Sequence, residues 1–188
     1  TGPETVKIGD KTVNTEHILI ASGSEPAVPP VNGMDSPCVL DSSGVLDLDH
    51  VPASMAIIGA GVIGLEFADV FSSLGTDVTV LEMLPRAGAG VSEDVVKRLT
   101  ASLKKQGVTF SFSSTVKTVS DNRVTYTDAK GNGQETTAAC ILNATGRRPV
   151  VRGLGLDAAG VTYSEKGIPV SPNMQTNVKN IWACGDVT

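Results

Sequence analysis

The stretch Ala56-Ile57-Ile58-Gly59-Ala60-Gly61-Val62-Ile63-Gly64-Leu65-Glu66 decides how this chain folds. A short apolar run, residues 56–58, leads directly into a Gly-x-Gly-x-x-Gly turn. Apolar residues then recur at helical spacing over residues 62–74, and Gly75 supplies the stop of a helix. The β-branched segment DVTVLE, residues 77–82, follows as a second strand. This order predicts a βαβ unit with parallel strands, and therefore an α/β fold.

Each part of this unit has a physical role in holding a dinucleotide, so we expect a Rossmann-like domain. Gly59 permits the tight turn, Gly61 lets a pyrophosphate approach the backbone, and Gly64 lets the helix pack closely on the strand. The first N–H groups and the positive end of the helix dipole then face the phosphates. Glu82 lies 18 residues after the third glycine, near the spacing expected for an acid that binds the ribose.

The same carboxylate would repel the 2′-phosphate that distinguishes NADP from NAD. The next cation, Arg86, stands four positions later, and no arginine-rich clamp for that phosphate is evident, so we expect NAD. Two plainer interpretations stay open: the glycine turn is a strand–helix junction that binds nothing, and Glu82 is a solvated strand end. For Glu66, assigned to the first turn of the helix, we consider two roles equally: complementing the helix dipole, or lying near the nicotinamide end of the cofactor.

The rest of the chain is interpreted as strands and loops around this unit. Before it, we expect a strand, a turn and a second strand over residues 5–21, the second strand entering a buried sheet, and then loops over 22–52 with a short helix at 43–48. After it, we expect a helix from the N-cap Ser92 to Gln106, a meander of strands over 108–139 and a buried strand at 140–144. Loops over 150–180 and a strand at 181–184 complete the chain.

Composition narrows the class of protein. The chain has 188 residues, with 20 acidic and 15 basic side chains and a net charge of −5, which argues against a nucleic-acid-binding protein. Three distant cysteines (Cys38, Cys140 and Cys184) predict neither a disulfide framework nor a metal site, and suit a cytosol-like compartment. The longest apolar run ends at Glu66, too short to span a membrane. Because the sequence starts at Thr1-Gly2-Pro3, we expect a piece of a longer protein.

Four motifs in order resemble the flavin-dependent pyridine nucleotide–disulfide oxidoreductases, and most closely their dihydrolipoamide dehydrogenase branch. They are Ile20-Ala21-Ser22-Gly23-Ser24-Glu25-Pro26, Ile58 to Glu66, Ala144-Thr145-Gly146-Arg147-Arg148-Pro149, and Ile181-Trp182-Ala183-Cys184-Gly185-Asp186. The resemblance implies an NAD-binding domain at 38–149 inserted into an FAD-binding domain, of which residues 1–37 and 150–188 are parts.

The resemblance also assigns the cofactor-binding residues. On the NAD side it implies Gly59, Ala60, Gly61, Val62, Ile63, Gly64, Leu65, Glu66, Glu82, Val116 and Gly146. On the FAD side it implies Ser22, Gly23, Ser24 and Asp186, the last on the ribityl chain. Two positions depart from the family pattern, which more often has Thr at Ser22 and Asn at Val150.

The family reaction, as the resemblance implies it, is reduction of NAD+ by dihydrolipoyl groups through FAD and a redox disulfide. No Cys-x-x-x-x-Cys is present, so we assign no catalytic residue; the disulfide, the first glycine-rich turn and the dimerisation domain are expected outside this chain. His17 and His50 are expected to be structural or surface residues. The chain alone is expected to hold NAD, not to retain FAD, and to be inactive.

For the intact protein the resemblance implies a homodimer, and a 2-oxo-acid dehydrogenase complex as a partner. We expect a cytoplasmic location, or the mitochondrial matrix in a eukaryote, with no metal, nucleic acid or membrane bound. The alternatives are a mercuric reductase-like or NADH oxidase-like flavoenzyme and a non-catalytic dinucleotide sensor or scaffold. An NADP-dependent glutathione reductase is disfavoured by Glu82.

Overall fold

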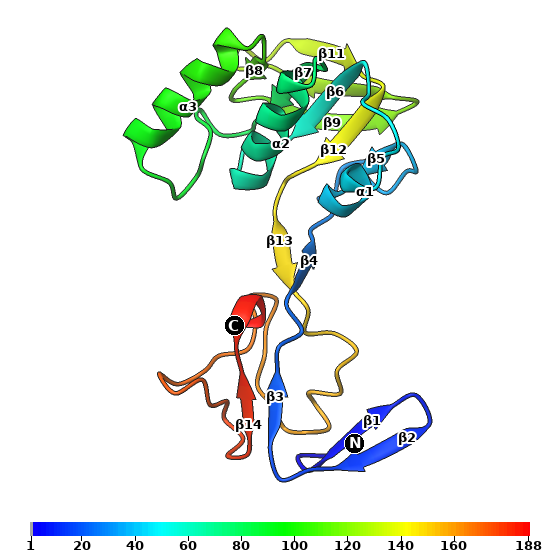
Figure 1. Cartoon of the computed structure of the whole chain (residues 1–188), viewed down its shortest axis with the longest axis vertical. Coiled ribbons are helices and arrows are strands. Elements are labelled where there is room, and N and C mark those ends of the chain that lie inside the picture. Colours follow the sequence, from blue (N-terminus) through cyan, green and yellow to red (C-terminus); the bar gives the residue numbers. More distant parts are fainter. Residues whose placement is uncertain (1) are drawn as a thin grey trace. The chain divides into compact units, whose positions relative to one another are not determined.

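The computed structural model describes residues 2–188 and divides into two compact units (Figure 1). The central unit comprises residues 26–146, and the split unit comprises residues 2–25 with 147–188. These units change at 25/26 and 146/147, whereas the sequence motifs placed the domain boundaries at 37/38 and 149/150. The assignment of segments to cofactor domains therefore stays a prediction. Within residues 2–188 no helix is both long and apolar enough to cross a membrane.

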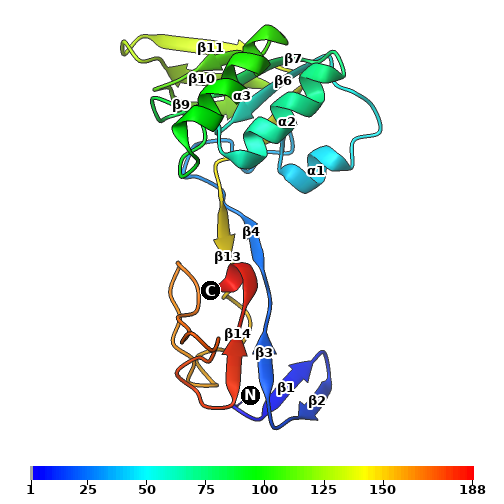
Figure 2. The ribbon, with the colours of Figure 1, turned by 60° about the vertical axis from the view of Figure 1, so that its left-hand side comes forward.

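The central unit contains a sheet of five parallel strands, which confirms the predicted α/β class (Figures 1 and 2). In spatial order the strands are β5 (Val39–Leu40), β12 (Cys140–Asn143), β6 (Ser54–Ile58), β7 (Asp77–Leu81) and β8 (Thr109–Ser111). The helices are α1 (Ser42–Leu46), α2 (Val62–Ser73) and α3 (Glu93–Lys105). Strand β6, the glycine turn, α2 and β7 form the βαβ unit predicted from residues 56–82.

Strand β6 is buried on both faces because alternate side chains enter two different cores. Met55 and Ile57 pack in a cluster with residues of α2 such as Leu65, and each is at most 4% exposed. Ala56 and Ile58 point to the opposite face and pack with residues of the antiparallel strands described next. Since apolar burial is the main stabilising term in folding, this doubly covered strand anchors the glycine turn that follows it.

A three-stranded antiparallel meander covers the second face of the sheet. Its strands are β9 (Thr115–Ser120), β10 (Arg123–Thr127) and β11 (Gly133–Thr137). The predicted meander over residues 108–139 is confirmed for this part, whereas residues 109–111 form β8 of the parallel sheet instead. Helix α3 begins after Ser92, the expected N-cap, but the Ser92 hydroxyl makes no capping hydrogen bond. Glu93 and Asp94 in its first turn, with Lys104 and Lys105 in its last, complement the helix dipole instead.

The split unit is built from pairs of strands and long loops. Its strands are β1 (Thr5–Ile8) with β2 (Lys11–Asn14), β3 (Ile18–Ile20) with β14 (Ile181–Ala183), and β4 (Ser24–Pro26) with β13 (Arg147–Pro149). The last residue of β4, Pro26, already belongs to the central unit, and a short 3₁₀ helix spans Gly185–Val187. The expectation that β3 enters a buried sheet is wrong: Leu19 is 62% exposed. Within the described residues β3 belongs to a two-stranded sheet, and only the side facing Ile181 and Ala183 joins a buried cluster.

Candidate dinucleotide site

The three glycines of the turn have distinct steric roles. Gly59 has a φ of +105°, and a Cβ there would lie 2.4 Å from the carbonyl oxygen of Ala144. A Cβ on Gly64 would lie 2.1 Å from the carbonyl oxygen of Gly59. A Cβ on Gly61, in contrast, would meet no atom within 4 Å. Two glycines are therefore required by packing, while the third leaves open space beside the backbone.

This open space lies at the positive end of α2. Gly61 is the N-cap of the helix, and no side chain caps it. The first backbone N–H groups of a helix have no intrahelical acceptor, and together with the dipole they attract an anion. The geometry of Gly61 and of the first turn of α2 therefore suits a phosphate group.

Glu82, just after β7, holds two backbone segments with one carboxylate. Its Oε2 accepts a hydrogen bond from the Ala60 amide at 2.6 Å, and its Oε1 accepts one from the Leu84 amide at 2.7 Å. A carboxylate offers about four acceptor positions, so about two remain for other donors. The acid predicted to bind a ribose thus also fixes the glycine turn relative to the loop after β7, a role that sequence reasoning did not identify.

A cavity of about 370 Å³ adjoins Glu82 and Gly59 within the central unit. Its volume lies within the range of small-molecule sites. Most of its wall is apolar, with contributions from Val28, Met34 and Val116. Among the described residues that line it, none is a lysine or an arginine. It therefore combines an apolar surface suited to a flat ring with one acid suited to hydroxyl groups.

Arg86, the cation nearest to Glu82 in sequence, lies outside this cavity wall. Its Nη1 donates to the carbonyl oxygens of Ala87 and Gly88, at 3.3 and 3.5 Å. The Nη1 group thus bonds to its own loop, Arg86 lies outside this cavity, and among the described residues no cation of the cavity wall faces Glu82 to neutralise a 2′-phosphate.

The structure brings together only part of the predicted NAD set. Gly59, Glu82 and Val116 line the cavity beside Glu82 together. Gly146, which was predicted with them, is not among its lining residues, whereas the neighbouring Thr145 is. The remaining members lie along the turn and helix, where Ala60, Gly64 and Leu65 are buried and Val62 and Ile63 are at least partly exposed.

The placement of Glu66 in the first helical turn is wrong. The helix begins at Val62, so the fifth residue falls in the second turn, because one turn takes 3.6 residues. Glu66 is exposed and borders a groove between α1 and α2 together with Phe67 and Val70. Dipole complementation in the first turn is therefore excluded for this residue.

Residues that sequence reasoning missed fix the cavity wall near β12. The Asn143 amide donates to the Ala27 carbonyl oxygen at 2.8 Å, and the Thr145 hydroxyl donates to Asn143 Oδ1 at 2.7 Å. These bonds tie the segment that begins at Ala27 to the carboxyl end of β12. Their position at the carboxyl end of a predicted buried strand, Asn143 within it and Thr145 just after it, is a signal that could have identified them.

In the split unit, the residues predicted to face FAD converge although they are far apart in sequence. The Ser24 hydroxyl donates to Asp186 Oδ2 at 2.7 Å and accepts from Arg147 Nε at 2.8 Å. The Ser22 hydroxyl donates to the Val150 carbonyl oxygen at 2.7 Å. Arg147 belongs to the family motif at residues 144–149, which assigned it no role. The structure shows that it orients Ser24.

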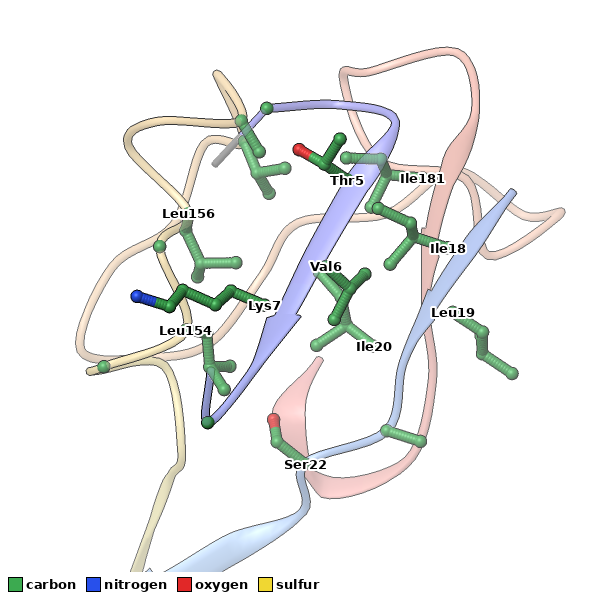
Figure 3. Close-up of a pocket in the computed structure, with 17 residues that line it drawn as sticks. Thr5, Val6, Lys7, Ile18, Leu19, Ile20, Ser22, Leu154, Leu156 and Ile181 are labelled. Atoms are coloured by element: carbon green, nitrogen blue, oxygen red, sulfur yellow. The ribbon is translucent and has the colours of Figure 1, made fainter. Parts of the chain in front are cut away.

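A second cavity, of about 580 Å³, lies in the split unit and includes Ser22 in its wall. Figure 3 shows Val6 from β1 with Ile18 and Ile20 from β3 gathered in this cavity, while Leu19 points away from them. The wall is mostly aliphatic and includes Leu154, which is 44% exposed. This cavity offers apolar surface and few polar groups.

A family model described as pyridine nucleotide-disulphide oxidoreductase matches residues 1–188. The chain belongs to this family. Within it, dihydrolipoyl dehydrogenase of Bacillus subtilis (strain 168) is 40% identical over 179 residues, covering 95% of this chain and 39% of the relative. The mitochondrial dihydrolipoyl dehydrogenase of Caenorhabditis elegans is 40% identical over 198 residues, covering 99% and 40%. The chain thus spans about two fifths of the length of these curated relatives.

A solved structure of the same kind supports the fold. The HOCl-induced flavoprotein disulfide reductase RclA from Escherichia coli aligns with a TM-score of 0.90 at 29% identity, over 100% of this chain and 43% of that chain. These matches confirm the resemblance to the pyridine nucleotide–disulfide oxidoreductases and the dinucleotide-binding fold. The cofactors of this family are FAD and a pyridine nucleotide.

Proposed function

We propose that the central unit binds NAD(H), and that the chain is the nicotinamide-nucleotide portion of a dihydrolipoyl dehydrogenase-like flavoenzyme. One observation carries the proposal. The open space beside Gly61, the start of α2 and the Glu82 carboxylate lie close together in space within the central unit, beside an apolar cavity. The backbone at Gly61 and Val62 would hold the diphosphate, and Glu82 would bind the ribose hydroxyls. The cavity wall at Val28, Met34 and Val116 would hold the adenine.

The preference for NAD over NADP rests on charge. A 2′-phosphate would place a dianion beside the Glu82 carboxylate, and the described wall of this cavity offers no lysine or arginine to compensate. Like charges in close contact are strongly unfavourable when both are partly shielded from water. Hydroxyl groups, in contrast, can donate to the remaining lone pairs of the carboxylate.

For the split unit we propose contact with FAD through Ser22, Gly23, Ser24 and Asp186. The fit rests on Asp186, an exposed carboxylate whose Oδ2 is held by Ser24 and whose other oxygen can accept a ribityl hydroxyl. When bound, FAD supplies the redox chemistry of such enzymes, and the protein contributes binding and orientation. The residues of this chain would position the two nucleotides, while the redox disulfide would belong to other parts of the protein.

The wider assignments follow the relatives, which are dihydrolipoyl dehydrogenases. In the intact protein we propose oxidation of dihydrolipoyl groups with NAD+ as acceptor, a homodimeric enzyme and membership of a 2-oxo-acid dehydrogenase complex. A mitochondrial relative makes the matrix the proposed site in a eukaryote, and the cytoplasm the site in a bacterium. The proposed domain assignment keeps NAD at residues 38–149 and FAD at 1–37 and 150–188, with the addition that Val28 and Met34 of the first segment contribute to the proposed adenine wall.

The test is a titration of the chain with NADH, followed by the nicotinamide fluorescence, for the wild type and two variants. Gly61→Ala should weaken NADH binding by about tenfold or more, since a methyl group would occupy the phosphate position, a loss of about 1.4 kcal/mol. Its φ of −70° suits alanine, and no atom lies near the added Cβ, so stability should stay within about 0.5 kcal/mol.

Gly133→Ala is the matched control, because Gly133 also has open space at its Cβ position but lies at the start of β11. This variant should bind NADH as the wild type does. Absence of saturable binding by the wild type at millimolar NADH, or equal weakening by both variants, would refute the proposal.

A further inference from the structure

A third cavity in the central unit, of about 350 Å³, lies between α3, the loop after β7 and the end of β8. It shares no lining residue with the cavity beside Glu82. Lys97, Ala101 and Lys104 of α3 line it together, as expected for residues spaced by four and three along one helix face. Its volume suffices for a small ligand. It is therefore a separate site within the same unit.

The charge of this cavity differs from that of the chain as a whole. Arg86, Lys97 and Lys104 line it, against one acid, Glu93. The chain carries a net charge of −5, and no lysine or arginine occurs in residues 12–85. A cavity in which one sign of charge predominates, here three cations against one acid, concentrates counter-ions. The cavity is thus a local positive region on an acidic protein.

The charges of these cations are not satisfied by protein acids. Among the ion pairs within residues 2–188, none involves Arg86, Lys97 or Lys104. Arg86 is held only by two long hydrogen bonds to carbonyl oxygens of its own loop. Three cations around one cavity, without a carboxylate partner, leave donors available to an anionic group.

The floor of the cavity is apolar and includes an aromatic ring. Phe112 is half-buried and stacks on Phe110, with ring centroids 5.4 Å apart. The Lys104 ammonium lies 5.9 Å from the centroid of the Phe112 ring, within the range of a cation–π contact. Val96, 5% exposed, adds aliphatic surface. Because Phe110 and the Lys104 ammonium both lie against the Phe112 ring, a flat apolar group would contact the remaining surface of this ring and Val96, beside the lysines.

We propose that this cavity binds a small anion attached to a planar apolar ring, the class that comprises aryl phosphates and aryl carboxylates. The ring packs on Phe112 and Val96, and the anionic group is bound by Lys97, Lys104 and Arg86. The site is independent of the proposed dinucleotide site, because the two walls have no residue in common.

The test uses the ¹⁵N-labelled 188-residue chain and NMR titrations with phenyl phosphate, benzoate, inorganic phosphate and phenol. Phenyl phosphate or benzoate should bind saturably, at least about tenfold more tightly than inorganic phosphate and phenol, since only the first two offer both ring and charge. The shifted amide signals should include those of Lys97, Ala101 and Phe112. If benzoate alone binds, the anion is a carboxylate; if phenyl phosphate alone binds, it is a phosphate.

Two double variants give a matched comparison on the same helix. Lys97→Gln with Lys104→Gln should weaken binding of the aryl anion about tenfold or more. Arg98→Gln with Lys105→Gln removes the same charge from residues that do not line the cavity, and should change binding by less than about twofold. All four side chains are exposed, so both variants should fold, which a thermal melt checks.

Four results would overturn the proposal. They are absence of saturable binding by either aryl anion up to about 20 mM, equal affinity for inorganic phosphate, equal loss in both double variants, and displacement of the aryl anion by NADH with shifts near Gly59 and Glu82. The last result would assign the ligand to the dinucleotide cavity instead.

Discussion

The two units of this chain hold their proposed cofactor residues in different ways. In the central unit the glycine turn follows β6, whose side chains are buried on both faces of a five-stranded sheet. In the split unit, Ser22 follows β3, a member of a two-stranded sheet whose Leu19 is 62% exposed. The first arrangement relies on packing. The second relies on hydrogen bonds such as those of Ser24 with Asp186 and Arg147.

The residues of the two proposed cofactor sites are therefore held in position by different interactions. A site on strand ends that are packed on both sides is positioned mainly by the core, and bonds such as those of Glu82 and Asn143 then tie the flanking loops to it. A site on strands with one exposed face must be fixed locally, and Arg147 and Ser24 do so for Asp186. We therefore expect the dinucleotide site to depend on core residues, and the split-unit site to depend on its polar network.

The largest effect is expected from the core of the central unit. Ile57→Ala should lower the free energy of unfolding by about 2–5 kcal/mol, because Ile57 is fully buried and its truncation leaves a cavity. Leu19→Ala in the split unit is the matched change and should cost less than about 0.5 kcal/mol, since Leu19 is mostly exposed. Urea unfolding followed by far-ultraviolet circular dichroism measures both. Similar losses would show that the contrast between the two units is not real.

A smaller loss of stability should distinguish Gly64, which is required by packing, from Gly61, which borders open space. Gly64→Ala should destabilise the chain by about 1–3 kcal/mol, because its Cβ would overlap a backbone oxygen, although alanine favours a helix by about 1 kcal/mol. NADH binding should weaken as well, since the turn must shift. Gly61→Ala, in contrast, should weaken binding without loss of stability. A Gly64→Ala variant as stable as the wild type would contradict the steric role of Gly64.

The sequence predicted the central unit better than the split unit, for a physical reason. The βαβ unit is specified by local periodicity and by glycines whose roles depend on neighbours a few residues away, such as Gly64 against Gly59. The exposure of Leu19 depends on what covers the strand, which local pattern does not encode. The bond between Ser24 and Asp186 joins residues 162 positions apart, and only the motif resemblance linked them.

Within the site, the sequence identified residue types but not their partners. Glu82 was found from its spacing, whereas its bond to the Ala60 amide requires a specific path of the loop after β7. Glu66 was placed one turn too early although the predicted helix start at Val62 was correct, because the fifth helical residue lies beyond a first turn of 3.6 residues. The apolar wall at Val28 and Met34 comes from a loop-rich segment without periodicity, so no pattern pointed to it.

An effect of intermediate size concerns the choice of nucleotide in the central unit. Glu82→Gln removes the negative charge while keeping the side chain's size. We expect the ratio of NADH to NADPH affinity to fall by about tenfold, equivalent to about 1.4 kcal/mol, as the repulsion of the 2′-phosphate is lost. Parallel fluorescence titrations with the two nucleotides measure this ratio. Asp77→Asn, at the opposite end of β7, is the control and should leave the ratio unchanged.

A ratio that stays constant in Glu82→Gln would remove the carboxylate from nucleotide selection. It would leave Glu82 with only the structural role shown by its bonds to the Ala60 and Leu84 amides. Glu82→Gln keeps at most one of these bonds, because its amide nitrogen cannot accept from a backbone N–H. Glu82→Ala removes both bonds and should lower stability more than Glu82→Gln does.

The smallest effect concerns the pH dependence of stability, to which Cys140 of the central unit should contribute. Burial raises the pKa of the Cys140 thiol in β12 above its ordinary value of 9.0, since the thiolate would be poorly solvated there. The folded state thus binds this proton more tightly than the unfolded state does. The stabilising contribution is complete below the ordinary thiol pKa and is lost as the pH rises through the raised value.

Cys140→Ala should therefore show a shallower loss of stability above pH 9 than the wild type, in urea titrations at pH 8 to 10. A thiol reagent at pH 8 gives a second measure, because Cys140 should react only as fast as the central sheet opens, and Cys184 faster. Equal reaction rates would show that the sheet around β12 opens as readily as the split unit, and would contradict the packing contrast between them.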